Sequence, residues 1–325
     1  MVRTFNLLDL PLLYRYRTQG LCLDNTFLLT WGSTLFPIGA ILGALLPSTG
    51  VFTYLAVNED KADQPLLVQA AHSAGSALAR LTFIAPHNVL NSSALSRLLE
   101  HIATQFGSRG AYNLIAEVEE KSSVFEALHQ NHYSIYAWQR LWKLSDSYPT
   151  ESCEPCWRPA TDDHMTNIRQ LIADLVPGMV KQIELQPESP SNGWVIRKDN
   201  ELLAYVNLRY GPRGILAQPY IHPEADLECS HLSNLFSTIP NPLNRPVYIS
   251  ARSYQAWLDP MLEDINAEPG PLQAVIVKRL AATIPVRQPI SLPSLEDGRP
   301  EISTPITHIS NKNSPVSYDK TTYNR

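Results

Sequence analysis

Cysteine and histidine have the widest chemical repertoire in this chain of 325 residues, and their spacing limits what they could do. Cys153 and Cys156 form a C-x-x-C pair, a pattern found in redox sites and as half of a zinc site. A zinc site needs two more ligands nearby, and neither a second cysteine pair nor an H-x-x-x-H pair occurs. A thioredoxin-like pair would open a helix after a strand, whereas this pair precedes a predicted strand at 157–160. We interpret both as ordinary thiols and expect no metal site.

Composition and charge exclude several functional classes. The apolar fraction is 44%, which is normal for a globular protein, and the length suits two domains. The net charge is −5 and the pI is near 6.0, so no basic surface for nucleic acid or an anionic membrane is expected. Asp9 interrupts the apolar stretch near the N-terminus and no signal-peptide cleavage pattern follows, which predicts a cytoplasmic protein.

One order of elements occurs twice along the chain. Residues 92–144 are predicted to form a helix, a strand at 112–118, a short helix and a second strand. Residues 226–282 repeat this order, with strands at 246–250 and 272–281. Two copies of one α/β unit in a single chain indicate tandem domains.

The domain organisation follows from this repeat. We predict a first domain at 1–146, a linker at 147–155, a second domain at 156–284 and a disordered Pro/Ser/Thr-rich tail at 285–325. Each domain should carry a mixed, mostly antiparallel sheet flanked by helices, which is an α/β (α+β) fold. In the first domain the elements expected before the repeat are helices at 10–17 and 35–46 and strands at 2–5, 51–57, 65–72 and 78–84.

The apolar stretch at 27–47 raises the alternative of a membrane-associated protein. It approaches the ~20 residues that a spanning helix needs. Thr30, Gly32 and Pro37 interrupt it, and the uninterrupted apolar part, Leu35–Leu46, has the length of a buried helix. We therefore expect no membrane span.

The element order resembles that of the GNAT N-acetyltransferase superfamily. The resemblance is strongest at 98–118, which looks like the family's long helix, a glycine turn at Gly110 and the fifth strand. It continues at 124–133, which looks like the next helix and the turn after it. The second domain looks like a more diverged copy. The resemblance implies two tandem GNAT-like domains that cover most of residues 1–284 and that pack on one another within the chain.

The same resemblance implies acetyl-CoA or another acyl-CoA as cofactor. Its pantetheine arm would lie between the splayed fourth and fifth strands, and the backbone of Leu81, Thr82 and Phe83 would polarise the thioester. The pyrophosphate would sit at the start of the long helix. There the family has a glycine-rich loop, but this chain has 90–95, which contains no glycine. In place of that loop, Asn91, Ser92 and Ser93 are the candidate phosphate-binding residues. The second domain also lacks the loop.

The resemblance to the GNAT superfamily also implies candidate catalytic residues in this chain. Glu117, on the predicted fifth strand, is the candidate general base. The alternative is a solvated acid at the end of a strand. Leu128 stands where the family commonly has a tyrosine that acts as general acid and protonates the departing thiolate. Arg80 either meets an anionic ligand or points into solvent. Arg252 follows the second domain's fifth strand and faces either the cleft or the surface.

Two functions compete. The first, which we rank ahead because the resembling fold is so often used in this way, is an N-acyltransferase that transfers an acetyl or acyl group to a small-molecule amine or peptide. The second is a catalytically inactive GNAT-fold scaffold that binds a ligand or a protein, which the missing loops and tyrosine favour.

Overall fold

The computed structural model describes residues 1–32, 35–57, 64–87, 93–145, 156–184, 189–190, 192–198, 201–225 and 229–281. We call residues 1–145 the N-terminal half and residues 156–281 the C-terminal half. The elements of the N-terminal half are β1 (Val2–Thr4), α1 (Leu10–Tyr16), β2 (Leu21–Cys22), α2 (Asn25–Trp31), α3 (Leu35–Leu45), β3 (Val51–Ala56), β4 (Leu66–His72), β5 (Leu78–Ala85), α4 (Ser93–Ser108), β6 (Asn113–Glu119), α5 (Ser123–Gln130) and β7 (Ser134–Lys143).

The C-terminal half repeats the order long helix, strand, short helix, strand. Its elements are β8 (Arg158–Pro159), α6 (Met165–Leu175), α7 (Gly178–Ile183), β9 (Gly193–Lys198), β10 (Glu201–Tyr210), β11 (Ile215–Ile221), α8 (Cys229–Thr238), β12 (Val247–Arg252), α9 (Leu258–Asp264) and β13 (Glu268–Arg279). The series α8, β12, α9, β13 corresponds to α4, β6, α5, β7. Both copies of the repeat therefore form the elements that the sequence predicts.

One sheet of thirteen strands is formed by the described residues, in the order β1-β3-β4-β5-β6-β13-β7-β12-β11-β10-β9-β8, with β2 beside β5. Two neighbouring pairs are parallel, β5 with β6 and β11 with β12. The other pairs in this sheet, including β2 with β5, are antiparallel. This confirms the predicted mixed, mostly antiparallel α/β architecture.

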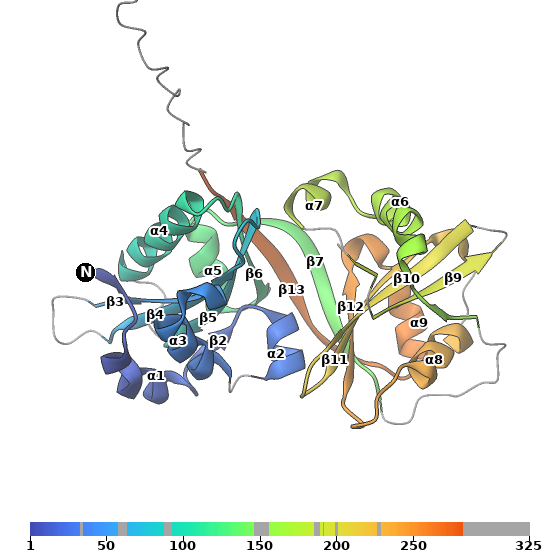
Figure 1. Cartoon of the computed structure of the whole chain (residues 1–325), viewed down its shortest axis with the longest axis horizontal. Coiled ribbons are helices and arrows are strands. Elements are labelled where there is room, and N and C mark those ends of the chain that lie inside the picture. The colour runs from blue at the N-terminus through green and yellow to red at the C-terminus, as the bar shows by residue number, and fades with distance from the viewer. Residues whose placement is uncertain are drawn as a thin grey trace, which may run out of the picture. The chain divides into compact units, whose positions relative to one another are not determined.

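The two halves exchange their last strands. β13, from the end of the C-terminal half, lies between β6 and β7 of the N-terminal half, and β7 in turn pairs with β12 (Figure 1). At the centre β7 and β13 pair with each other in antiparallel register, with Ala137 opposite Val275. Each half therefore depends on a strand of the other to complete its sheet.

Alternation along the strands places helices on both faces. In the N-terminal half, Val68 packs towards α4 and α5, while Leu67 packs towards α1 and α3. In β13, Ile276 joins the core under α4, and Val275 joins a core formed with α6 and α7. The part of β13 at 274–277 is buried on both faces, and its sequence is accordingly a continuous apolar run instead of an alternation of apolar and polar residues.

The apolar stretch at 27–47 forms two helices. No single helix among the described residues has the length and apolarity to cross a membrane. Taken together, α2 and α3 reach that length and apolarity, but the chain bends by 106° between them. Phe36 and Ala40 of α3 are buried in the core, whereas Ile38, Leu42 and Leu45 are exposed. The predicted linker at 147–155 and tail at 285–325 lie outside the described residues, so those boundaries stay predictions.

We expect a change in β13 to destabilise the N-terminal half. Ile276 is 1% exposed and lies in the core under α4, so Ile276→Ala should lower the free energy of unfolding by about 2–5 kcal/mol. Leu272 on the same strand is 37% exposed, and Leu272→Ala should cost about 1 kcal/mol or less. Urea unfolding followed by circular dichroism measures both. Equal losses, or an N-terminal half that unfolds unaffected by Ile276→Ala, would contradict the strand exchange.

Candidate functional site

The parallel strands β5 and β6 diverge after a short contact. They pair only at Leu78–Asn113, Ala79–Leu114 and Arg80–Ile115. Beyond that point, residues 21–23 enter the gap between them. β2 pairs with β5, the Leu23 N–H donates to the Thr82 carbonyl at 2.9 Å, and the Leu23 carbonyl accepts from the Glu117 N–H at 2.9 Å. The chain's own backbone thus bridges the first gap as an extra strand.

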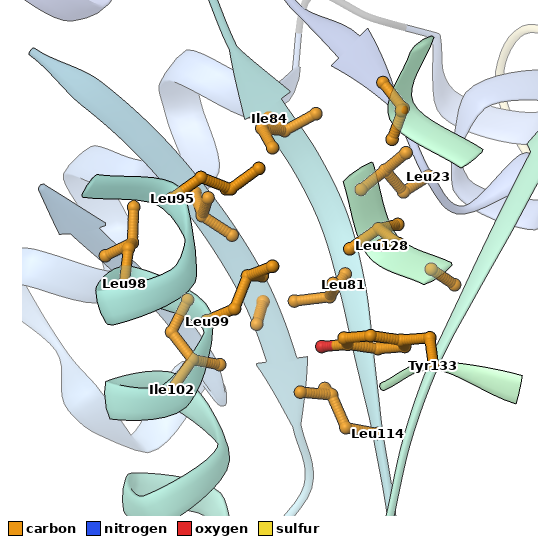
Figure 2. Close-up of a cluster of buried hydrophobic side chains, with 14 of the residues drawn as sticks. Leu23, Leu81, Ile84, Leu95, Leu98, Leu99, Ile102, Leu114, Leu128 and Tyr133 are labelled. Atoms are coloured by element: carbon orange, nitrogen blue, oxygen red, sulfur yellow. The ribbon is translucent and has the colours of Figure 1, made fainter. Parts of the chain in front are cut away.

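Side-chain packing holds this segment in place. Leu23 is 2% exposed and lies among Leu81, Ile84 and Leu128 in the core of the N-terminal half (Figure 2). Gly20 lies so close to Phe83 that a Cβ atom there would be 1.9 Å from the ring. Segment 20–23 is therefore anchored by Leu23 in the core, while Leu21 stays exposed.

The C-terminal half has the equivalent second gap, between β11 and β12. These strands pair only from Ile215–Val247 to Ala217–Ile249. Beyond them the buried side chain of Gln255 takes the place of a strand. Its Oε1 accepts from the Ile221 N–H at 3.0 Å, and its Nε2 donates to the Pro219 carbonyl at 2.9 Å. One amide side chain thus satisfies two backbone groups that the divergence leaves free.

The predicted cofactor residues lie around the first gap. Leu81, Thr82 and Phe83 are on β5 and are buried, and Thr82 and Phe83 face residues 21–23. Ser93 is the first residue of α4 and is exposed, while Asn91 and Ser92 lie outside the described residues. The roles proposed for these residues stay predictions. A pantetheine arm between β5 and β6 would have to displace residues 21–23, so the residues present do not fit acetyl-CoA in the first gap.

A polar cavity of about 400 Å³ lies between the N-terminal and C-terminal halves, next to the start of α2. We call it the central cavity. The residues that line it come from both halves: Asn25, Thr26, Ala71, His72, Ser73, Ser76, Leu78, Arg80, Glu117, Gln139, Leu141, Glu184, Asn207, Arg209, Leu216, Gln218, Tyr220, Ser250 and Arg252. Its size falls within the range of ~300–1,000 Å³ that is usual for ligand pockets.

Glu117 is buried in the wall of this cavity. Its side chain is 7% exposed, its Oε2 accepts from the Asn25 N–H at 2.9 Å, and its Oε1 is 3.9 Å from Arg80 Nη1. The alternative of a solvated acid at the strand end is wrong, because β6 turns this side chain inwards. The catalytic role of Glu117 stays a prediction. Arg80 lines the cavity with 29% of its side chain exposed.

Amide side chains form a hydrogen-bonded row where the exchanged strands β7 and β13 pair. Gln139 of β7 and Gln273 of β13 are in register, and Gln139 Nε2 donates to Gln273 Oε1 at 3.0 Å. Asn25 Nδ2 donates to the same oxygen at 2.7 Å, and Ser250 Oγ donates to Gln139 Oε1 at 3.3 Å. These hydrogen bonds hold Asn25, Gln139 and Ser250 in the wall of the cavity and connect α2 to both halves.

A buried ion pair faces them from the C-terminal half. Arg252 Nη2 lies 2.7 Å from Glu184 Oε1, and the Tyr136 hydroxyl donates to the same oxygen at 2.9 Å. Burial raises the pKa of Tyr136, and the Glu184 carboxylate adds to the rise, so the phenol keeps its proton. Arg252 is thus inside the cleft, as one of the two sequence-based interpretations had it.

Comparison with solved structures places this geometry among known folds. A GCN5-related N-acetyltransferase from Sphaerobacter thermophilus is similar with a TM-score of 0.54 and 10% identity, covering 87% of this chain and 98% of that one. The chain has the GNAT fold. A tandem GNAT protein from the clavulanic acid biosynthesis pathway gives a TM-score of 0.47 and 12% identity, covering 86% and 98%. No protein-family model and no curated protein matches the sequence.

The elements that adapt this GNAT fold were those that the sequence analysis missed. β2 has two residues, and α2 was weighed only as part of an apolar stretch. A signal for α2 was present: Asp24 is an N-cap residue type, and its Oδ1 does accept from the Phe27 N–H at 3.1 Å. Arg209 and Glu184 carried no local signal, because each reaches the cavity only through the tertiary fold.

Removing the Gln255 amide should destabilise this GNAT fold. Gln255→Ala leaves the Ile221 N–H and the Pro219 carbonyl buried without a partner, which costs about 1–3 kcal/mol for each group. Gln130→Ala, at an exposed position in α5, is the matched control and should cost less than about 0.5 kcal/mol. Urea unfolding measures both. A loss for Gln255→Ala no larger than the control's would show that the second gap does not need this side chain.

Asp24 should make stability depend on pH. Burial raises the pKa of its carboxyl and nearby Glu117 adds to this, while Arg80 opposes it. A raised folded-state pKa means that the contribution of Asp24 to stability is fully present below its unfolded pKa of about 3.9 and is lost as the pH rises through the folded-state pKa. Asp24→Asn keeps an oxygen for the Phe27 N–H and should be more stable than wild type at pH 7, by on the order of 1 kcal/mol.

That advantage should shrink as the pH falls towards 4. Asp9 provides a control of opposite sign, because its hydrogen bonds with Arg3 lower its pKa. Asp9→Asn should therefore lose stability at pH 7, and the loss should shrink towards pH 4. Unfolding curves at pH 7, 5 and 4 measure both variants. A destabilised Asp24→Asn at pH 7 would contradict the prediction.

Proposed function

We propose that this protein is a binding scaffold of the GNAT fold that holds a small polar molecule in its central cavity, and that it does not act as a conventional acyl-CoA transferase. The alternative of an inactive scaffold, weighed from the sequence, is the one that the geometry supports best. The central cavity supports the binding of a small molecule, and the filled gaps argue against an acyl-CoA.

The filling of both gaps is the observation that carries this proposal. Residues 21–23 bridge the first gap and Gln255 bridges the second. At the start of α4, Leu95 stands where the GNAT loop has a glycine, and it is fully buried in the core. A cofactor would have to displace residues 21–23 to enter the first gap, or the Gln255 side chain to enter the second.

Acyl transfer is the second candidate, favoured by one observation. β5 keeps an irregular register with β4 between Gln69 and Ala70, next to the gap, and β2 is only two residues long. If segment 20–23 were displaced, a GNAT-type gap would open beside this irregularity. In that case the candidate acceptor would be an amine in the central cavity.

Titration of the full chain with acetyl-CoA and with free CoA separates these functions. We expect no binding up to millimolar concentration, with wild type or with Leu23→Ala, which weakens the anchor of segment 20–23. Binding at micromolar strength by the wild type would overturn the scaffold proposal. Binding by Leu23→Ala alone would favour acyl transfer from a masked gap.

A substitution that fills the central cavity tests whether the protein holds its ligand there. A panel of small polar molecules of each charge should include ligands that raise the melting temperature of the wild type. Gln218→Trp should abolish those shifts, because Gln218 lines the cavity and is half-buried. Gln130→Trp at the surface is the control and should keep them. Shifts that survive Gln218→Trp would place the ligand elsewhere.

A further inference from the structure

We propose that the ligand of the central cavity is a small organic anion, whose carboxylate or phosphate group is held by Arg252, Arg209 and Arg80. This inference rests on the proposed function, because it names the chemical class of the molecule that the cavity holds. Three arginines in one cavity wall, two of them from the C-terminal half, are its starting point.

Arg252 has unused hydrogen-bonding capacity. The residue is 6% exposed, and only its Nη2 has a partner, the Glu184 carboxylate. Its Nε and Nη1 are buried and have no acceptor among the described residues. Buried donors without partners are rare because each one costs free energy. A cavity that borders such a guanidinium is a place where an acceptor can be supplied from outside the protein.

Arg209 adds a second cation, which forms no salt bridge with a carboxylate in the part of the chain that the structure describes and whose charge acts on buried Asp24. It lies near the end of β10, its side chain is exposed to the cavity, and it makes no hydrogen bond or salt bridge with any residue in the part of the chain that the structure describes. An exposed arginine keeps its charged head in water, and a bound anion can replace that water. Its backbone position, opposite Leu216 on β11, aims it at the same wall as Gln218.

The charge balance of the lining favours an anion. The carboxylates that line the cavity are Glu117 and Glu184, and each already faces one arginine, Arg80 and Arg252 respectively. Arg209 forms no salt bridge with either of them. Asp24 does not line the cavity but interacts electrostatically with Arg80 and Arg209, and burial raises the pKa of its carboxyl, so its neutral form competes less with an outside anion for these two arginines. Guanidinium groups in a partly desolvated site bind carboxylate and phosphate oxygens in a fixed geometry and more strongly than in water.

Neutral polar groups complete the site. Gln218, Asn207 and Ser250 line the cavity beside the arginines and could orient the rest of the ligand. The cavity offers only four apolar side chains, Ala71, Leu78, Leu141 and Leu216. A compact polar anion therefore matches the lining better than an apolar acid does.

The test is isothermal titration of the full chain with succinate, inorganic phosphate and the neutral succinamide, at one fixed ionic strength. We expect succinate or phosphate to bind and succinamide to bind at least tenfold more weakly. Arg209→Ala should weaken anion binding about tenfold or more, because this side chain has no structural partner to lose. Arg97→Ala on α4 removes the same charge at an exposed position and should change the affinity by less than twofold.

Arg252→Lys is the second variant, since it keeps the charge beside Glu184 but loses the forked donor. It should also weaken anion binding about tenfold, and a preserved circular dichroism spectrum shows that it is folded. Equal affinity in Arg209→Ala and wild type, or equal loss in Arg97→Ala, would overturn the anion site. Binding of neutral or cationic molecules alone would overturn it while leaving the scaffold intact. Micromolar acetyl-CoA binding would instead overturn the scaffold itself.

Discussion

The structure depends on one constraint: two strands that diverge inside a protein leave backbone N–H and carbonyl groups that must find partners. The chain meets this requirement twice from its own residues. In the N-terminal half, residues 21–23 supply a backbone, and in the C-terminal half Gln255 supplies a side chain. The two solutions are chemically different, yet both close the gap between the diverging strands. The proposed function of a scaffold without acyl-CoA rests on this closure.

Closing the first gap also builds the site next to it. Segment 20–23 leads directly into α2, whose first backbone N–H meets Glu117 and whose Asn25 side chain joins the amide row. At its other end α2 reaches the C-terminal half, where the Arg213 N–H donates to the Thr30 carbonyl at 2.9 Å. Gly211 is required there, because a Cβ atom would lie 2.2 Å from that carbonyl oxygen. α2 thus closes one side of the cavity and joins the halves beyond the exchanged strands.

The sequence predicted what depends on local periodicity and missed what depends on pairing at a distance. The repeats at 92–144 and 226–282 carry regular apolar spacing, so their elements were found. Strand exchange leaves no such trace, since β7 and β13 look the same whichever neighbour they choose. Gln255 contacts Ile221 across 34 residues, and Arg252 meets Glu184 across 68. Glu117 was predicted as a general base, a role that stays a prediction; its contact with the Asn25 N–H depends on α2, which the sequence pattern did not reveal.

The arrangement of charge in the cavity wall supports the proposed binding of an anion. Glu117 Oε2 accepts from the Asn25 N–H and its Oε1 lies 3.9 Å from Arg80, while Glu184 Oε1 accepts from both Arg252 and Tyr136. Both carboxylates thus help to position helices and arginines. The groups left with unused capacity are donors: two nitrogens of Arg252, and Arg209, which has no hydrogen bond or salt bridge within the described part of the chain. A wall whose buried donors lack acceptors is suited to hold an anion. These donors come from the C-terminal half, and the GNAT fold places them opposite Arg80 of the N-terminal half in one cavity.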